Sequence, residues 1–199
     1  MNPRHVRLLL VLGAFLAGLV LCLSVVVLVR GLILRPDGPS VAAIGGPFQL
    51  VNQDEHAVTD QDMRGKPFLV FFGFTHCPEI CPTALFEMSQ ILRGLGPDAD
   101  RVRALFITVD PERDTPKVLK DYLSNFDPHL SGLTGDPESI AAVAKGYRVI
   151  YRKVPLEHGD YTMDHTALVY LMDKQGRFVS PFSLKRTTEA SVTELRKHL

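Results

Sequence analysis

The chain has 199 residues, and 22 Lys and Arg residues balance 22 Asp and Glu residues. A formal net charge of zero argues against a nucleic-acid-binding protein, which would carry a basic excess or a clustered basic stripe. At about 100–200 residues per domain, the length allows one globular domain with additional segments.

The first predicted element is a transmembrane helix over residues 8–29, which carry no charged side chain. A helix needs about 20 such residues to cross a bilayer, whereas the apolar run of a signal peptide is about 7–15 residues long. We expect an uncleaved anchor between a short cytoplasmic tail (1–7) and a linker containing Pro, Gly and Ser (30–46). Because the tail is too short for a mitochondrial transit peptide, we expect a bacterial inner membrane. The domain at 47–199 would then face the periplasm or the cell exterior, where disulfides persist.

Strand-like and helical segments alternate within residues 47–199. The run PFLVFFGF at 67–74 is typical of a strand that is buried on both faces. The predicted strands are 48–51, 56–58, 67–74, 102–109, 149–154, 166–172 and 177–182, and the predicted helices are 82–95, 115–126, 137–147 and 191–199. This order predicts an α/β sandwich with a central mixed sheet. A strand followed by a cysteine pair that opens a helix is the thioredoxin-like arrangement.

Two of the three cysteines stand four residues apart in the stretch FTHCPEICP, where Cys77 follows the buried strand and Cys81 begins the next helix. A helix N-terminus favours the thiolate, which is both a nucleophile and a ligand for soft metals. Residues at i and i+4 of a helical turn lie about 5–6 Å apart between Cβ atoms, which suits one soft ion and, after adjustment, a disulfide. The pair is therefore predicted to be functional, as a redox pair or as a metal site. Cys22, inside the apolar run, is predicted to be a small buried hydrophobe.

A third ligand would favour the metal site. Two thiolates are too few for zinc but suit Cu(I), which accepts two or three soft ligands. His165 is the best candidate, because it immediately precedes the predicted strand 166–172. In a thioredoxin-like sheet that strand runs antiparallel to the strand before the cysteines, so its start lies beside them. Asp164 would restrain this loop, accept a hydrogen bond from the histidine, or be solvated. The remaining histidines are expected to shape the cysteine loop (His76), to lie in solvated loops (His56, His129, His158) or to lie near the ends of the chain (His5, His198).

Three segments of the chain resemble the SCO/SenC family of membrane-anchored, thioredoxin-like copper chaperones for cytochrome c oxidase assembly. They are GFTHCPEICP (73–82), VDPERDTP (109–116) and DHT (164–166). The resemblance implies that Cys77, Cys81 and His165 bind one copper ion, as Cu(I) or Cu(II). It implies as partner the copper-accepting subunit of cytochrome c oxidase, which would receive copper or have its cysteines reduced. Thr166 is a small departure, because the family more often has Ser at this place.

Two other functions stay open from the residues. An extracytoplasmic thiol–disulfide oxidoreductase or thiol peroxidase would attack through Cys77 and resolve with Cys81, and His165 would be structural. The C-x-x-x-C spacing and the absence of Trp argue against this enzyme. A structural disulfide in a membrane-anchored interaction module would need no histidine. The stretch Asp110–Pro116 is predicted to be a helix-capping loop, and its grouped acids and arginine also suggest a partner-docking surface.

Overall fold

The structure is a computed structural model that describes residues 3–33 and 44–199. The chain divides into two compact units, Met1–Ala42 and Ala43–Leu199. Of the predicted linker, residues 34–43 lie outside the described residues.

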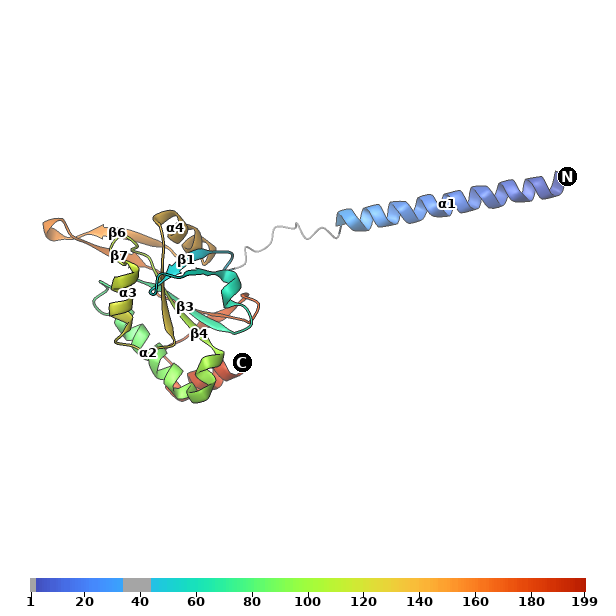
Figure 1. The fold of residues 1–199 in the computed structure, drawn as a ribbon. Helices are drawn as coiled ribbons and strands as arrows, with labels where there is room; N and C mark the ends of the chain where they lie inside the picture. Colours follow the sequence, from blue (N-terminus) through green and yellow to red (C-terminus); the bar gives the residue numbers. More distant parts are fainter. Residues whose placement is uncertain (1–2, 34–43) are drawn as a thin grey trace. The chain divides into compact units, whose positions relative to one another are not determined.

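The N-terminal unit contains one helix, α1 (Pro3–Ile33; Figure 1). The side chains described in it are those of residues 12–13 and 15–28, so the predicted anchor at 8–29 lies partly outside them. Within the described residues, no helix combines the length and the apolar character needed to cross a membrane. Cys22 is exposed on α1, and its burial in a membrane stays a prediction.

The globular unit is built on a seven-stranded sheet with the strand order β2-β1-β5-β4-β3-β8-β9 (Figure 1). The central strands β3, β4 and β5 are parallel, whereas β1, β8 and β9 are antiparallel to their neighbours. These strands are β1 (Gln49–Asn52), β2 (Ala57–Thr59), β3 (Phe68–Gly73), β4 (Arg103–Thr108), β5 (Leu130–Thr134), β8 (Val169–Met172) and β9 (Phe178–Phe182). The predicted mixed sheet is confirmed.

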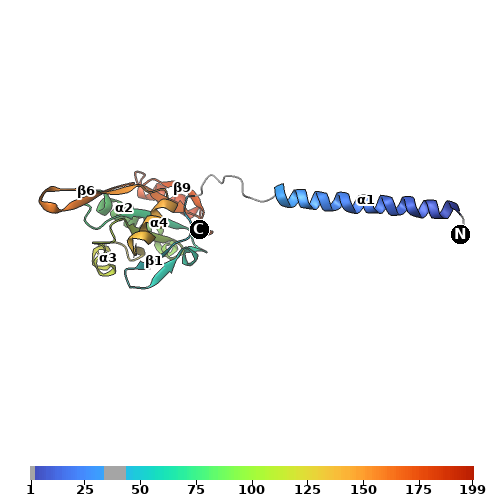
Figure 2. The same cartoon turned by 90° about the horizontal axis from the view of Figure 1, so that it is seen from above.

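The remaining elements are four helices of the globular unit, three short 3-10 helices and a separate hairpin. The helices are α2 (Ile80–Leu95), α3 (Pro116–Leu123), α4 (Pro137–Gly146) and α5 (Thr188–Arg196), and the 3-10 helices are η1 (Asp60–Met63), η2 (Gly96–Arg101) and η3 (Glu157–Gly159). Strands β6 (Tyr151–Pro155) and β7 (Tyr161–His165) form a two-stranded antiparallel sheet of their own. This hairpin projects from the body of the unit in both ribbon views (Figures 1 and 2).

Helices cover both faces of the large sheet. Successive side chains of a strand point to opposite faces, so each face contributes apolar side chains for a helix to bury. On one face Phe106 of β4 packs against Tyr122 of α3, with ring centroids 6.0 Å apart. On the other face Phe72 of β3 packs against Tyr147, which follows α4, at 5.3 Å. Every residue of β3 is buried, as the apolar run predicted. Each buried Phe side chain stabilises the fold by about 1.5–3 kcal/mol.

Helix starts follow their capping residues. The hydroxyl of Thr115 accepts a hydrogen bond from the Val118 backbone N–H, and the Asp136 carboxylate accepts one from Ser139, so both predicted caps are confirmed. The last helix begins at Thr188 rather than at residue 191, because Thr187 caps it by accepting from the Ala190 N–H.

Two strands were not predicted from the sequence, namely β5 and β7. Strand β5 reads LSGLT, and its glycine and serine interrupt the apolar run that marks a buried strand. Strand β7 reads YTMDH and lies in the projecting hairpin. The predicted strand at 166–172 therefore begins only at Val169, and His165 ends β7 instead of directly preceding β8.

Candidate metal centre

The two cysteines lie at the turn between β3 and α2. Cys81, in the first turn of α2, is fully buried, while Cys77 in the preceding loop is partly exposed. The backbone N–H of Cys81 donates to the Cys77 Sγ atom at 3.3 Å. The sulfur thus accepts one of the N–H groups that the start of a helix leaves unpaired. This contact holds both sulfurs on one side of the turn, as the i, i+4 spacing predicted.

Gly73, the last residue of β3, makes room for the buried sulfur. A Cβ atom built on Gly73 would lie 2.7 Å from Cys81 Sγ and 2.7 Å from Phe106 Cε2. A glycine is therefore needed for α2 to bring Cys81 against the sheet. The sequence predicted no role for Gly73, although a glycine at the end of a buried apolar strand is a signal for close approach of another group.

His165 reaches the cysteines from the end of β7. Its Nε2 atom lies 3.6 Å from Cys81 Sγ, and its Nδ1 atom lies 3.3 Å from the Thr166 carbonyl oxygen. Because a carbonyl only accepts hydrogen bonds, Nδ1 carries the proton and the Nε2 lone pair faces the sulfur. The Phe74 ring packs edge-on against the imidazole, with centroids 5.8 Å apart. These contacts fix both the tautomer and the direction of the ring.

Burial sets the protonation of the cluster. It lowers the pKa of His165, against the opposing effects of the Thr166 carbonyl and the Asp164 charge, so the imidazole is neutral near pH 7. Burial also raises the pKa of Cys81, and the neighbouring charges of Cys77 and Asp114 add to this shift. Cys81 therefore keeps its proton until a cation replaces it.

The three side chains form a ligand set for a soft metal ion. The Cys77 and Cys81 sulfurs and a His165 ring nitrogen all lie within 4.8 Å of one another. With metal–sulfur bonds of about 2.3 Å, as for zinc, two ligand atoms of one ion stand at most about 4.6 Å apart, so small shifts suffice to bind one ion. Thiolates and imidazole suit copper. Among the described residues, this is the one group of three or more His, Cys, Asp or Glu side chains with ligand atoms so close together.

The other residues predicted around the site lie outside this cluster. His76 is exposed, and its Nδ1 atom is 3.1 Å from the Thr75 hydroxyl, which agrees with a role in shaping the loop. Asp164 pairs with Arg152 across the hairpin at 3.0 Å, while the Nδ1 atom of His165 faces the Thr166 carbonyl instead of this carboxylate. His56 and His158 are exposed, as expected.

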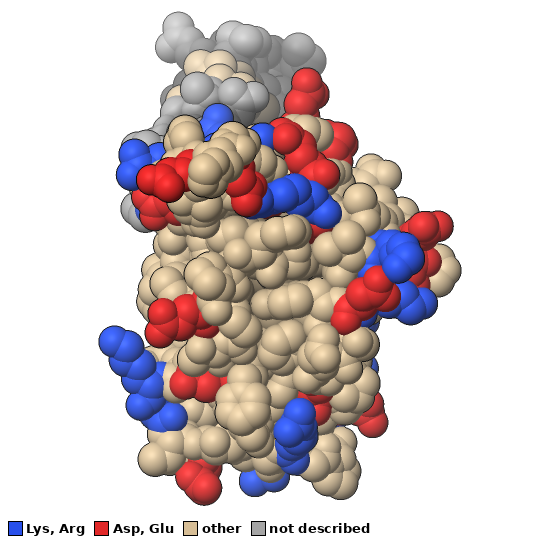
Figure 3. Space-filling view, turned by 90° about the vertical axis from the view of Figure 1, so that its left-hand side faces the viewer, with Lys and Arg blue, Asp and Glu red and all other residues tan. Residues whose placement is uncertain are grey.

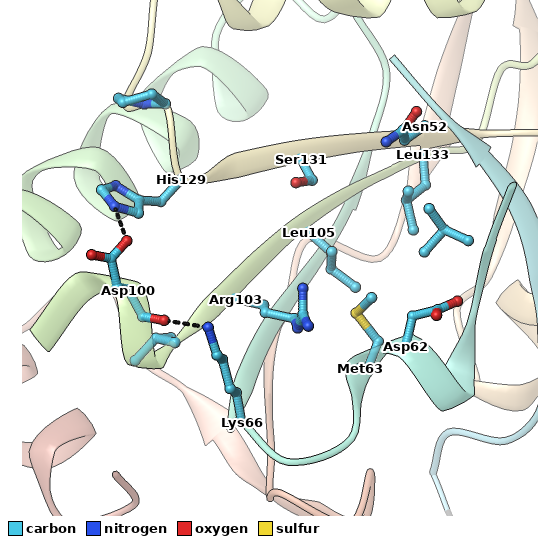
Figure 4. Close-up of a pocket in the computed structure, with 13 residues that line it drawn as sticks. Asn52, Asp62, Met63, Lys66, Asp100, Arg103, Leu105, His129, Ser131 and Leu133 are labelled. Atoms are coloured by element: carbon cyan, nitrogen blue, oxygen red, sulfur yellow. Dashed lines mark hydrogen bonds and ion pairs between the residues drawn. The ribbon is translucent and has the colours of Figure 1, made fainter. Parts of the chain in front are cut away.

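His129, whose side chain is 35% exposed, lines a separate pocket of about 300 Å³ (Figure 4). Its ring pairs with Asp127 at 2.7 Å and with Asp100 at 3.4 Å, and the hydrogen bond to Asp127 raises the pKa of His129. The pocket lies near Arg103, where β4 begins, whereas the cysteines follow the opposite end of the parallel strand β3. Its lining contains no cysteine, so it is distinct from the cluster.

An apolar groove of about 580 Å³ borders the cluster between α2 and the strands β8 and β9. Ile80, next to Cys81, and Leu168, three residues after His165, lie in its lining and are 55% and 46% exposed. The face of the molecule in Figure 3 also has a broad central area without Lys, Arg, Asp or Glu, and charged side chains lie around it. The surface beside the cluster thus offers apolar contacts to a partner.

The fold and the cluster together define a class of protein: a thioredoxin-like domain whose cysteine pair is joined by a histidine from a later hairpin. Residues 36–199 match the SCO1/SenC family model, and the chain belongs to this family. The resemblance of the three sequence segments is thereby confirmed.

Solved structures of named relatives agree with this assignment. The structure of Bradyrhizobium japonicum ScoI with copper bound is 64% identical and has a TM-score of 0.78, and the match covers 79% of this chain and all of that chain (100%). Yeast Sco1 with copper bound is 36% identical with a TM-score of 0.72, over 78% of this chain and 88% of that chain. These matches confirm the predicted thioredoxin-like fold.

Among curated proteins, the mitochondrial "Protein SCO1 homolog 1" of Arabidopsis thaliana is 42% identical over 172 residues. The match covers 81% of this chain and 51% of the relative. The chain therefore spans about half the length of that relative.

Proposed function

We propose that the protein is a copper chaperone that binds one copper ion through Cys77, Cys81 and His165 and supports copper-centre assembly of cytochrome c oxidase. The observation that carries this proposal is the approach of three soft ligand atoms to within 4.8 Å, from a loop, a helix and a distant hairpin. Membership of the SCO1/SenC family and the copper-bound Sco structures support copper as the cargo. The similar structure of BsSco, a member of the Sco family of cytochrome c oxidase assembly proteins, supports the oxidase as the destination.

Three ligands leave an open side at the ion, and this opening is the basis of transfer. A thiolate of the copper-accepting oxidase subunit enters there, and the ion passes by ligand exchange while the chaperone's own ligands leave. Copper and a Cys77–Cys81 disulfide exclude each other, because both need the same sulfur lone pairs. The pair must therefore be reduced before copper is loaded.

The second candidate function is an extracytoplasmic thiol–disulfide oxidoreductase or thiol peroxidase. It is favoured by the two sulfurs, which lie within 4.8 Å of each other, so that one could attack and the other resolve. This enzyme would need no metal and would not need the imidazole of His165.

Copper binding by the reduced globular unit, residues 44–199, distinguishes the two functions. This unit is compact by itself, and the whole Bradyrhizobium chain corresponds to 79% of the present one. We expect one copper ion per molecule to survive dialysis against a competing chelator. His165→Ala and the pair Cys77→Ser/Cys81→Ser should lose it, whereas His76→Ala, an exposed histidine beside Cys77, should keep it. Metal-free disulfide reduction that survives His165→Ala, with no retained copper, would instead establish the enzyme.

We also infer that residues 8–29 anchor the chain in a bacterial inner membrane and that the globular unit faces the periplasm or the cell exterior. The support is the uncharged run of the sequence over these residues. Alkaline carbonate extraction should leave the full chain in the membrane fraction and release a chain of residues 44–199. Protease added to spheroplasts should digest the globular unit of the full chain. Release by carbonate, or full protection from protease, would contradict the inference.

A further inference from the structure

His165 is carried by a hairpin that stands apart from the main sheet. Within residues 44–199, β6 and β7 pair with each other and with no strand of the seven-stranded sheet (Figures 1 and 2). At the base of the hairpin, the Thr166 N–H donates to the Ile150 carbonyl at 2.9 Å. The cysteines instead lie on the turn after β3. The hairpin and the cysteine turn therefore meet through side-chain contacts rather than through ladder hydrogen bonds.

The loop 110–114 makes such contacts with the hairpin. The Tyr161 hydroxyl donates to Asp110 Oδ1 at 2.9 Å, and Arg113 Nη1 donates to the Tyr161 carbonyl at 2.9 Å. The Arg113 guanidinium also stacks 3.7 Å from the centroid of the Tyr161 ring, and its Nε–H donates to the buried Asp110 carboxylate. The loop thus contacts the hydroxyl, the ring and the backbone of Tyr161, which stands four residues before His165. Partly buried charge-assisted hydrogen bonds and cation–π contacts of this kind are stronger than exposed ion pairs.

The same loop also holds the cysteine turn. Asp114 is fully buried and accepts hydrogen bonds from the Thr75 N–H at 3.0 Å, the Thr75 hydroxyl at 2.6 Å and the Thr108 hydroxyl at 2.6 Å. Thr75 precedes Cys77 by two residues. One short loop therefore connects the two halves of the ligand cluster, which lie far apart in the sequence.

We propose that Asp110, Arg113 and Tyr161 are positioning residues that set the distance between His165 and the two cysteine sulfurs. This proposal rests on the proposed copper site. It replaces the hypothesis that the acids and the arginine of the loop form a docking surface, because Asp110 and Asp114 are buried and Arg113 is 18% exposed and turned onto the hairpin. Of the charged residues of the loop, Glu112 alone is exposed, and it pairs with Lys153 of the hairpin at 2.6 Å.

The expected signature of this role is a change in preference between copper oxidation states. Loosening the hairpin leaves both sulfurs in place but withdraws the imidazole. Cu(I) is satisfied by two thiolates, whereas Cu(II) prefers a larger set that includes nitrogen ligands. Loss of the positioning contacts should therefore weaken Cu(II) binding far more than Cu(I) binding and raise the reduction potential of the bound copper.

The test uses Tyr161→Phe in the globular unit, which removes one hydroxyl and keeps the ring. The matched control is Tyr170→Phe, because the buried Tyr170 ring packs against Phe72, on the face of the sheet away from Phe106, and its hydroxyl makes no hydrogen bond among the described residues. We expect the ratio of Cu(II) to Cu(I) affinity to fall about 10–100-fold for Tyr161→Phe, the size of effect that goes with losing one hydrogen bond to a charged group. The Cu(II) electron paramagnetic resonance spectrum should change with it, and Tyr170→Phe should match the wild type.

A measurement on the copper-free protein tests the positioning role independently of the proposed chaperone function. In the metal-free protein, NMR relaxation of the His165 ring and of residues 151–165 should show greater mobility in Tyr161→Phe than in the wild type or in Tyr170→Phe. If the wild type binds no copper, the chaperone function fails and this measurement still decides the positioning role. Unchanged mobility, together with an unchanged affinity ratio where copper binds, would overturn it. If Tyr161→Phe does not fold, Arg113→Lys, which keeps the charge and loses the planar fork, takes its place with the same readouts.

Discussion

Replacing Gly73 with Ala should damage the copper site more than it damages the fold. The added Cβ would lie 2.7 Å from Cys81 Sγ, and ordinary contact begins at 3.4 Å, so the sulfur or the strand must move by about 0.7 Å. Metal–ligand distances tolerate deviations of only about 0.2 Å, and we expect the copper affinity to fall about 10–100-fold. Crowding in the core should lower the free energy of unfolding by about 1–3 kcal/mol, partly offset by about 0.4–1 kcal/mol because Ala restricts the unfolded chain.

Gly132→Ala is the matched control for this experiment. Gly132 is also a strand glycine, and its Cβ would lie 2.7 Å from Leu123 Cδ1, on α3 rather than at a cysteine. Urea unfolding and competition for copper by a chromophoric chelator should be measured for both variants and the wild type. Both should lose stability, and only Gly73→Ala should lose copper affinity. Wild-type affinity in a Gly73→Ala protein that is destabilised as much as Gly132→Ala would refute the idea that this glycine shapes the site.

Three further predictions follow from protonation and capping. Copper must displace the proton of Cys81, whose pKa is raised by burial, so Cu(I) affinity should rise with pH by about tenfold per unit for each proton released, and a flat profile between pH 6 and 8 would contradict this. Burial raises the pKa of Asp114, although its hydrogen bonds from Thr108 and Thr75 oppose the shift, so folding takes up a proton. Its contribution to stability is then present at low pH and is lost as pH rises through the folded pKa, which lies above the ordinary value of 3.8. Asp114→Asn should therefore flatten that part of the curve of unfolding free energy against pH. Asp136→Ala removes the cap of α4 and should lower the free energy of unfolding, measured by thermal unfolding, by about 1 kcal/mol without loss of copper. Loss of copper would contradict this, because it would couple the start of α4 to the ligand cluster.

Local signals predicted most of the fold. The buried strand β3 was visible as an uninterrupted apolar run, and the starts of α3 and α4 were visible in Thr115 and Asp136, because a cap needs only residues a few positions apart. Strand β5 was missed because Gly132 and its serine neighbour break the run where α3 packs closely on the sheet.

The three ligands of the cluster were predictable from the sequence, but the hairpin that carries His165 and the contacts that hold this hairpin were not. The cysteine spacing and the expected antiparallel neighbour of β3 led to His165, and β8 does run antiparallel to β3. The histidine nevertheless arrives on β7, a strand that belongs to a separate hairpin. The contact of Tyr161 with Asp110 joins residues 51 positions apart, and the sequence pattern of neither segment predicts this contact. Such contacts are fixed by the packing of the whole domain rather than by local propensity.

The separation of the ligands along the chain gives the copper ion a mechanical role. Cys81 and His165 are 84 residues apart, so a bound ion is a reversible cross-link that closes a long loop of the folded domain. A ligand that binds only the folded state adds about 4 kcal/mol to its stability when present at 1,000 times its dissociation constant. Under the proposed chaperone function, transfer of the ion to an acceptor removes this cross-link between the hairpin and the cysteine turn. The copper-free protein should then resist heat and proteases less than the copper-loaded one.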